Sequence, residues 1–320
     1  MKHHFGDMLD RTGGHWTVVP NRERYAYQMP EWTSGQKSIS IATISSGDTN
    51  WELISTFPNL EELTLHDPSS EQISFVSQLW RLKRLRITHA RVKDIGFIER
   101  LQNLEELILE YVSGFSDISP VGALKRLRAL HIENLRRVSD FSGLGDAINL
   151  RYLGMYGTVD WAQPVESFAF LSRLTSLEYL GLHFIKAPKD DQPLASLKQV
   201  PNLRKLSISM NTFPLEVFAW IESNLPEVEG AIRPAFVRFG GKDEEIHPRD
   251  IRFRMPRDEF DSFPNLFIGQ DGKRYQRTPY QAALLGRGQR GLTGSKDKVD
   301  RACEQHTGVY RTLVTAFAND

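Results

Sequence analysis

The sequence predicts an α/β solenoid, because one leucine pattern recurs along much of the chain. The pattern L-x-x-L-x-L, with Ile or Met at its end in some copies, starts at positions 60, 82, 104, 127, 150, 177 and 203. In each copy the alternate apolar side chains of a strand point to one face. A single copy cannot bury that face, whereas stacked copies bury a continuous core. We therefore expect about eight coils, whose strands form a parallel sheet on the concave side of an arc.

The segments between the strands predict how each coil returns. Apolar residues recur there, and an Asp precedes Ile or Phe at Asp94, Asp117 and Asp140. A short carboxylate can accept bonds from nearby backbone N–H groups and fix a turn. The early returns are short enough to be turns or 3₁₀ pieces, while residues 165–174 and 215–224 leave room for helical turns. A weaker copy, Ile39-Ser-Ile41, precedes the array.

These residues resemble the leucine-rich-repeat superfamily, in particular the short 22-residue repeats of bacterial internalin-like proteins. The resemblance covers residues 37–230. It implies a leucine-rich-repeat domain that binds another protein. It also implies that this chain itself acts as a bacterial immunity or inhibitor protein against a toxin, or as an adaptor. The chain departs from the family where an Asn usually follows the strand, since only Asn211 fits and apolar residues stand at most other copies. We expect apolar filling to replace the missing asparagine ladder.

Both ends of the array are expected to be capped, because a solenoid exposes its core there. Residues 1–36 are predicted to form an N-terminal cap, with a hairpin of 16–19 and 24–27 and with Trp32 and Trp51 covering the first coil. Residues 231–320 are predicted to form a small α+β unit. Its expected strands are 236–239, 251–255 and 266–268, with a turn at Asp271-Gly272 and a final helix capped by Ser295.

The composition of the chain indicates which classes of protein it does not belong to. The 320 residues include 40 Lys plus Arg and 40 Asp plus Glu, so the formal net charge is +0. This balance argues against a surface built throughout for nucleic acid or anionic lipid. One cysteine, Cys303, excludes an internal disulfide and fits a reducing compartment. The sequence has neither a signal-peptide-like apolar run nor a membrane-spanning one, so we expect a cytoplasmic protein that makes no membrane contact.

The residues around each catalytic or cofactor motif do not provide the structure that the motif needs. Gly286, Gly288 and Gly291 spell G-x-G-x-x-G, but too little chain follows for the βαβ unit that dinucleotide binding needs. Cys303 and His306 stand at helical spacing without a second pair of metal ligands. We therefore expect a protein that is not an enzyme and that needs no cofactor or metal.

A basic tract supports an alternative function. Residues 273–301 contain eight Lys or Arg and two Asp, with glycines between the arginines. Such a tract can bind phosphate or nucleic acid, and it can equally be a solvated loop. The candidate phosphate-binding residues are Arg287, Arg290, Lys296 and Lys298.

The concave face is the leading candidate for a binding surface. Outward strand positions carry histidines and aromatic side chains, which supply binding hot spots. Gly154, Gly157 and Gly181 are expected to leave a pocket beside them, and the mixed charges suggest a partner of complementary charge. The predicted partner-binding residues are Arg86, His89, Tyr111, His131, Tyr152, Tyr156, Tyr179, His183 and Phe184.

Overall fold

The computed structural model describes residues 9–10, 17–18 and 32–319. They form two compact units. The repeat unit extends to Thr212 and takes in 224–232, and the C-terminal unit consists of 213–223 and the chain from Arg233 onward. In the described part of the chain, no helix has the length and apolar character needed to cross a membrane.

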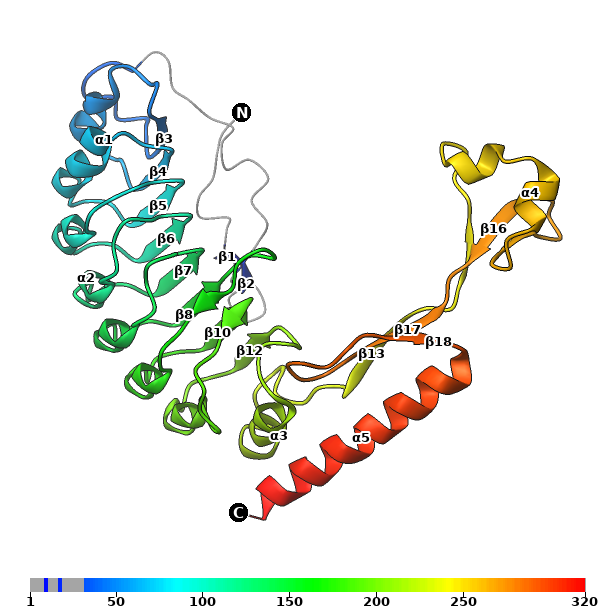
Figure 1. Cartoon of the computed structure of the whole chain (residues 1–320). Helices are drawn as coiled ribbons and strands as arrows, with labels where there is room; N and C mark the ends of the chain where they lie inside the picture. Colours follow the sequence, from blue (N-terminus) through cyan, green and yellow to red (C-terminus); the bar gives the residue numbers. More distant parts are fainter. Residues whose placement is uncertain (1–8, 11–16, 19–31, 320) are drawn as a thin grey trace. The chain divides into compact units, whose positions relative to one another are not determined.

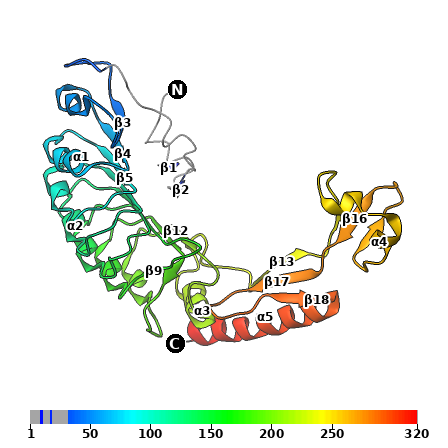
Figure 2. The same ribbon diagram turned by 45° about the horizontal axis from the view of Figure 1, so that its top comes forward.

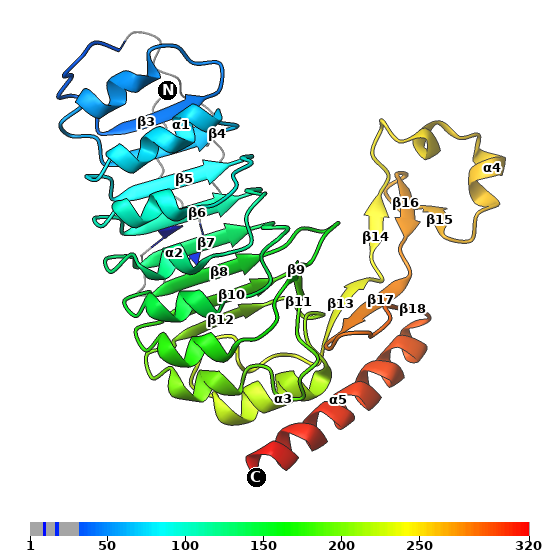
Figure 3. The same cartoon turned by 60° about the vertical axis from the view of Figure 1, so that its left-hand side comes forward.

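The repeat unit contains the predicted parallel sheet, which lines its concave side (Figures 1 and 3). Eight strands are hydrogen-bonded in chain order. The register sets leucine against leucine from strand to strand, as with Leu63, Leu85 and Leu107, and these side chains are buried. The solenoid fold is thereby confirmed. The strands are β3 (Ile41–Ser45), β4 (Glu62–His66), β5 (Arg84–Thr88), β6 (Glu106–Glu110), β7 (Ala129–Glu133), β8 (Tyr152–Tyr156), β10 (Tyr179–His183) and β12 (Lys205–Ile208).

Short helices form the returns on the opposite side (Figure 2). Most are 3₁₀ segments, and α1 opens with a capping box between Ser69 and Gln72. The expected helical turns at 165–174 are a 3₁₀ segment, because the extra residues of that coil form a turn closed between Thr158 and Trp161 and a short strand pair, β9 (Gln163–Pro164) with β11 (Ile185–Lys186). The returns are η3 (Trp51–Thr56), α1 (Ser70–Phe75), η4 (Val76–Gln78), η5 (Gly96–Arg100), α2 (Ser119–Gly122), η6 (Ser142–Asp146), η7 (Ala169–Arg173) and η8 (Ala195–Gln199).

The predicted aspartate turns are present. The carboxylates of Asp94, Asp117 and Asp140 each accept a hydrogen bond from the main-chain N–H two residues later, at 3.1, 2.8 and 2.8 Å. The bonds from Ser119 also lower the pKa of Asp117. Each turn therefore starts the next return segment at a fixed place.

Apolar filling at the usual asparagine position is also confirmed, since Ala90, Val112, Leu135 and Ile185 are buried. A different asparagine ladder, which was not predicted, stands before the first leucine of four coils. Each amide donates to a main-chain carbonyl of the preceding coil, and so links neighbouring coils. The pairs are Asn59 to Lys37 (2.7 Å), Asn103 to Trp80 (3.0 Å), Asn149 to Lys125 (2.8 Å) and Asn202 to Thr175 (2.8 Å).

The first coil differs in register from the prediction. Ala42 and Ile44, rather than Ile39 and Ile41, align with Leu63 and Leu65, because the strand starts at Ile41. In the N-terminal region, β1 (Leu9–Asp10) pairs antiparallel with β2 (Thr17–Val18). The pairing expected with 24–27 lies outside the described residues.

The C-terminal unit has two small antiparallel sheets and a long final helix (Figure 2). The predicted 251–255 strand is wrong, because Asp250 caps a 3₁₀ segment there. Its carboxylate accepts from the Arg252 main chain and guanidinium, which lowers the pKa of Asp250 to about 2. The elements are α3 (Leu215–Asn224), β13 (Phe236–Gly240), β14 (Asp243–Glu245), η9 (Ile251–Arg254), α4 (Arg257–Asp261), β15 (Leu266–Ile268), β16 (Arg274–Arg277), β17 (Tyr280–Leu284), β18 (Leu292–Gly294) and α5 (Lys296–Ala318).

Helix α3 is bonded to α5. The Tyr310 hydroxyl donates to Glu222 at 2.6 Å, and the Ser223 hydroxyl donates to the Val314 carbonyl at 2.7 Å. Residues 213–223 therefore belong with the C-terminal unit, although their position in the sequence suggests the return of the last coil. The predicted turn at 271–272 and the start of the final helix after Ser295 are confirmed.

Candidate functional site

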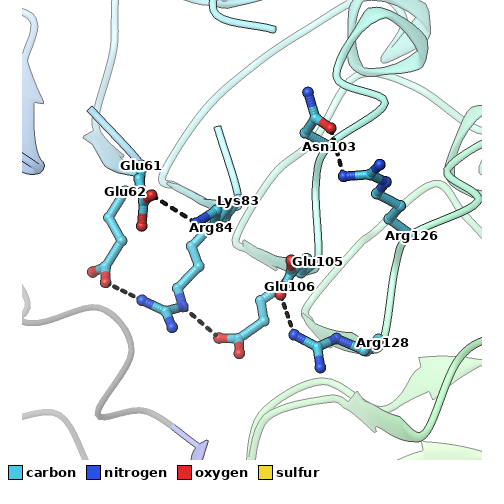
Figure 4. A network of polar contacts seen from close by, with 9 residues as sticks. All are labelled: Glu61, Glu62, Lys83, Arg84, Asn103, Glu105, Glu106, Arg126 and Arg128. Atoms are coloured by element: carbon cyan, nitrogen blue, oxygen red, sulfur yellow. Dashed lines mark hydrogen bonds and ion pairs between the residues drawn. The ribbon is translucent and has the colours of Figure 1, made fainter. Parts of the chain in front are cut away.

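Charged side chains cross the concave face as an alternating ladder (Figure 4). The Arg84 guanidinium lies between two carboxylates, 2.5 Å from Glu62 and 3.4 Å from Glu106. Beside it, Lys83 pairs with Glu61 at 2.6 Å and Arg128 pairs with Glu105. Cross-strand pairs of opposite charge stabilise a sheet. These charges neutralise one another, which leaves little net charge for the complementary partner that the sequence suggests.

Arg86 is buried in this face, with none of its side chain exposed, so its predicted contact with a partner is wrong. Its Nε and Nη2 atoms donate to Glu110 Oε2 at 3.0 and 2.6 Å. Among the described residues, Glu110, His131 and Glu133 bring one ligand atom each within 4.8 Å of one another. Such a trio can hold a metal ion, but the guanidinium already supplies positive charge there and repels a second cation.

Aromatic rings form a second layer on the face. Tyr152 and Tyr179 stack at 4.6 Å between centroids, and Tyr156 meets His131 and His183 edge to face at 4.7 and 4.8 Å. Tyr152, Tyr179 and His131 are buried, and Tyr156 and His183 are half-buried. Direct contact of a partner with the three buried residues is therefore also a wrong prediction, because the rings cover one another.

The glycines of this face do not leave the expected pocket. A Cβ on Gly154 would lie 2.9 Å from the His131 ring, and one on Gly181 would lie 2.8 Å from the Tyr156 hydroxyl. The chain's own rings thus occupy the space above both glycines. Gly157 is enclosed by main-chain atoms instead. The glycines allow the aromatic layer to lie close to the sheet.

Burial of this layer predicts a loss of stability at alkaline pH. Desolvation is the largest cause that raises the pKa of Tyr152 and of Tyr156 above the ordinary value of 10.0. Above about pH 10 the unfolded chain loses two protons that the folded chain keeps, so the free energy of unfolding falls by about 1.4 kcal/mol per pH unit for each tyrosine.

Urea unfolding measured from about pH 9 to 11 checks this expectation. The Tyr152→Phe/Tyr156→Phe variant should lose the part of the slope that these two tyrosines contribute, since phenylalanine does not titrate. Tyr310, whose pKa is also raised by burial, keeps its own contribution. An alkaline slope equal to that of the native protein would contradict the assignment.

On the concave side, the exposed aromatic side chains of Tyr111 and Phe184 stand where strands end. Six positions follow β4, β5, β6, β7, β8 and β10, and we call them the strand-end row. In five of them the backbone is left-handed, with φ between 46° and 58°. The main-chain N–H of each of the first five donates to the last residue of the next strand at 2.9–3.0 Å. The row is Asp67, His89, Tyr111, Asn134, Gly157 and Phe184.

This row brings together three of the predicted partner-binding residues. His89 is exposed, as are Tyr111 (37 %) and Phe184 (42 %). The His89 and Tyr111 rings stack at 4.9 Å with an interplanar angle of 5°, and His66 meets His89 edge to face. Near Phe184, both ring nitrogens of His183 bond to the hydroxyls of Ser207 and Ser209, at 2.8 and 3.0 Å. The row therefore presents oriented rings to solvent.

The basic tract, residues 273–301, contains both paired and exposed cations. Lys273 pairs with Glu245 and Arg277 with Asp243, both at 2.8 Å. The four candidate phosphate-binding residues, Arg287, Arg290, Lys296 and Lys298, are exposed, and their binding of phosphate stays a prediction.

The G-x-G-x-x-G segment joins two antiparallel strands, β17 and β18, which is not the context of a dinucleotide site. Cys303 packs in the core with Ala282 and Val299. His306 Nε2 lies 2.9 Å from the Leu285 carbonyl oxygen. These contacts give Cys303 and His306 structural roles.

No family model matches the sequence, and no curated protein matches it. Similar solved structures include an internalin (inlF) from Listeria monocytogenes str. 4b F2365, 23 % identical over 60 % of this chain and 59 % of that chain, with a TM-score of 0.41. An internalin C2 (inlC2) from the same strain is 23 % identical over 53 % of this chain and 74 % of its own (TM-score 0.42). TLR13, in a complex with ssRNA13, is 18 % identical over 54 % and 26 % (TM-score 0.40).

The chain thus spans about three fifths of the inlF structure. Its own residues define its architecture, since the leucine pattern returns seven times and all seven copies stack in one parallel sheet. The repeat unit is a solenoid of short leucine-rich repeats, each of which contributes one strand to the parallel sheet.

Proposed function

We propose that the protein is a non-enzymatic binding module that holds a partner protein on the strand-end row. The observation that carries this proposal is the pair of exposed aromatic side chains, Tyr111 and Phe184, on left-handed backbone. A left-handed conformation costs a non-glycine residue about 1–2 kcal/mol, whereas glycine adopts it without strain. Backbone strain at residues whose aromatic rings are exposed to solvent supports a role of these rings in recognition.

The spacing of the row favours a protein over a small molecule. His89 and Tyr111 form one aromatic patch at the ends of β5 and β6, and Phe184 forms another at the end of β10. Three strand spacings separate β6 from β10, which is about 14 Å. A protein surface of ordinary interface size reaches both patches. Tyr and Phe rings there supply the contact area that binding hot spots use.

We also propose that the protein is an immunity protein or other inhibitor, or an adaptor. Each of these acts by occupying its partner and needs no reaction centre. The arrangement of the histidines and carboxylates supports this view, because His183 is bonded to serines and Glu110 to Arg86. We propose that it acts in the cytoplasm, and a toxin-like gene beside its own would favour the immunity role.

The Tyr111→Gly/Phe184→Gly variant tests the site. Glycine removes both rings and relieves the left-handed strain, so partner binding should weaken at least about tenfold while thermal stability is kept or rises. Affinity purification with quantitative mass spectrometry identifies the partner in native lysate. Calorimetry with the purified partner then measures the affinity.

The matched control is Ile148→Ala/Ile232→Ala, which removes two exposed apolar side chains (51 % and 62 % exposed) of the repeat unit outside the strand-end row. This control should bind like the native protein. If the glycine variant retains native affinity, or the control loses as much, the strand-end row is not the binding site.

A further inference from the structure

A cavity of about 890 Å³ is lined by α1 and η4, by the loop after β5 with η5, and by one residue each from the loops after β6 and β7. Its lining includes none of the six residues of the strand-end row. Four cations and one carboxylate line it, and the cations come from two coils that are not neighbours in the stack: Arg91, Lys93 and Arg100 from the coil of β5, and Arg137 from the coil of β7. The carboxylate is Asp94, which accepts a bond from the Gly96 main chain.

The four cations differ in their pairing from the cations of the sheet. Within the described residues, none of them makes an ion pair or a side-chain hydrogen bond, whereas Lys83, Arg84 and Arg86 are all paired. Like charges that converge on one hollow repel each other, and the walls of a cleft focus their field. An anion bound in the hollow would relieve this repulsion.

The coil of β6 lies between the coils that carry these cations. It contributes Gly114 to the lining, a glycine with a φ of 104°. A Cβ there would lie 2.3 Å from the Val92 carbonyl oxygen, so the position requires glycine. The glycine lets the two coils pack closely here, and Arg91 and Arg137, from the coils before and after it, both line the hollow. Two coil spacings separate their backbones, which is about 10 Å.

The chemistry of the lining defines the ligand. Planar guanidinium groups bind phosphoryl oxygens in a two-pronged geometry, and the half-buried Phe97 in the same wall offers a flat apolar surface. A cavity of this size suits a small organic ligand. We propose that this cavity binds an organic phosphate of about nucleotide size, with its phosphates on Arg91 and Arg137 and its apolar part against Phe97.

Calorimetry with ATP, pyrophosphate and adenosine tests the site at low and at physiological ionic strength. We expect ATP and pyrophosphate to bind, more weakly as salt rises, and adenosine not to bind measurably. Arg91→Ala/Arg137→Ala should weaken ATP about a hundredfold, since each charged contact is worth about tenfold or more. Phe97→Ala should weaken ATP more than pyrophosphate.

The matched control, Lys186→Ala/Lys189→Ala, removes two exposed cations elsewhere on the repeat unit and should bind ATP as the native protein does. A melting curve of each variant checks that it is folded. The proposal is overturned if neither phosphate compound binds the native protein, or if the control pair weakens ATP as much as the arginine pair.

Discussion

Replacement of Arg86 by alanine is expected to lower the free energy of unfolding of the repeat unit by about 3–5 kcal/mol. The guanidinium is buried and donates twice to Glu110, which is itself buried. Once the guanidinium is gone, the Glu110 carboxylate stays in a place of low water access beside Glu133, its neighbour in register on β7. Urea unfolding followed by circular dichroism measures the loss.

Two further measurements separate the charge effect from simple loss of volume. Arg86→Met/Glu110→Leu removes both charges and keeps apolar bulk, so it should be markedly more stable than the alanine variant. The alanine variant also frees the trio of Glu110, His131 and Glu133 from the nearby positive charge. Zinc should therefore raise the melting temperature of Arg86→Ala more than that of the native protein. Equal stability of the alanine and the double variant would contradict this account of the pair.

Replacement of Gly157 by alanine is expected to cost about 3 kcal/mol, at the upper end of overpacking effects. Its Cβ would lie 2.3 Å from the Phe184 carbonyl oxygen, 2.5 Å from that of Trp161 and 2.7 Å from the Gln163 nitrogen. All three are main-chain atoms, so a side-chain rotation cannot relieve the contacts. The loop that carries β9 would have to move from its hydrogen bonds with Phe184 and Lys186.

The control for this variant is Gly47→Ala. A Cβ at Gly47 has no atom within 4 Å, so its melting temperature should stay within a few degrees of the native value. Thermal unfolding of both variants compares the two sites directly. If Gly157→Ala has the same melting temperature as Gly47→Ala, the loop accommodates the added methyl group without loss of stability, and the prediction is wrong.

The repeats were predictable because each leucine position has the same neighbours in every coil. Leu63, Leu85 and Leu107 are buried by identical stacking, so the period alone predicts sheet and core. Exposure on the outward face was not predictable in this way. Whether Tyr152 is covered depends on Tyr179 from the next strand and on the absence of a side chain at Gly154 and Gly181. An outward position is therefore not always an exposed one.

In the C-terminal unit, single polar contacts decide features that local sequence patterns do not show. The alternating residues 251–255 suggest a strand, yet the Asp250 carboxylate bonds to the Arg252 N–H and starts a 3₁₀ turn. Helix α3 has the pattern of a coil return, but its bonds to α5 come from residues about 90 positions later in the chain. No local pattern contains that contact.

The strand-end row has a consequence for how such a protein changes its specificity over generations. At Asp67, His89 and Tyr111 the main chain is held by the next strand, and these side chains point away from the leucine core. A single codon change at one of these places alters the surface that we propose for partner binding, while the main-chain bonds of the scaffold stay the same. Under that proposal, descendants of this chain acquire new partners in small steps, each of which leaves a folded protein.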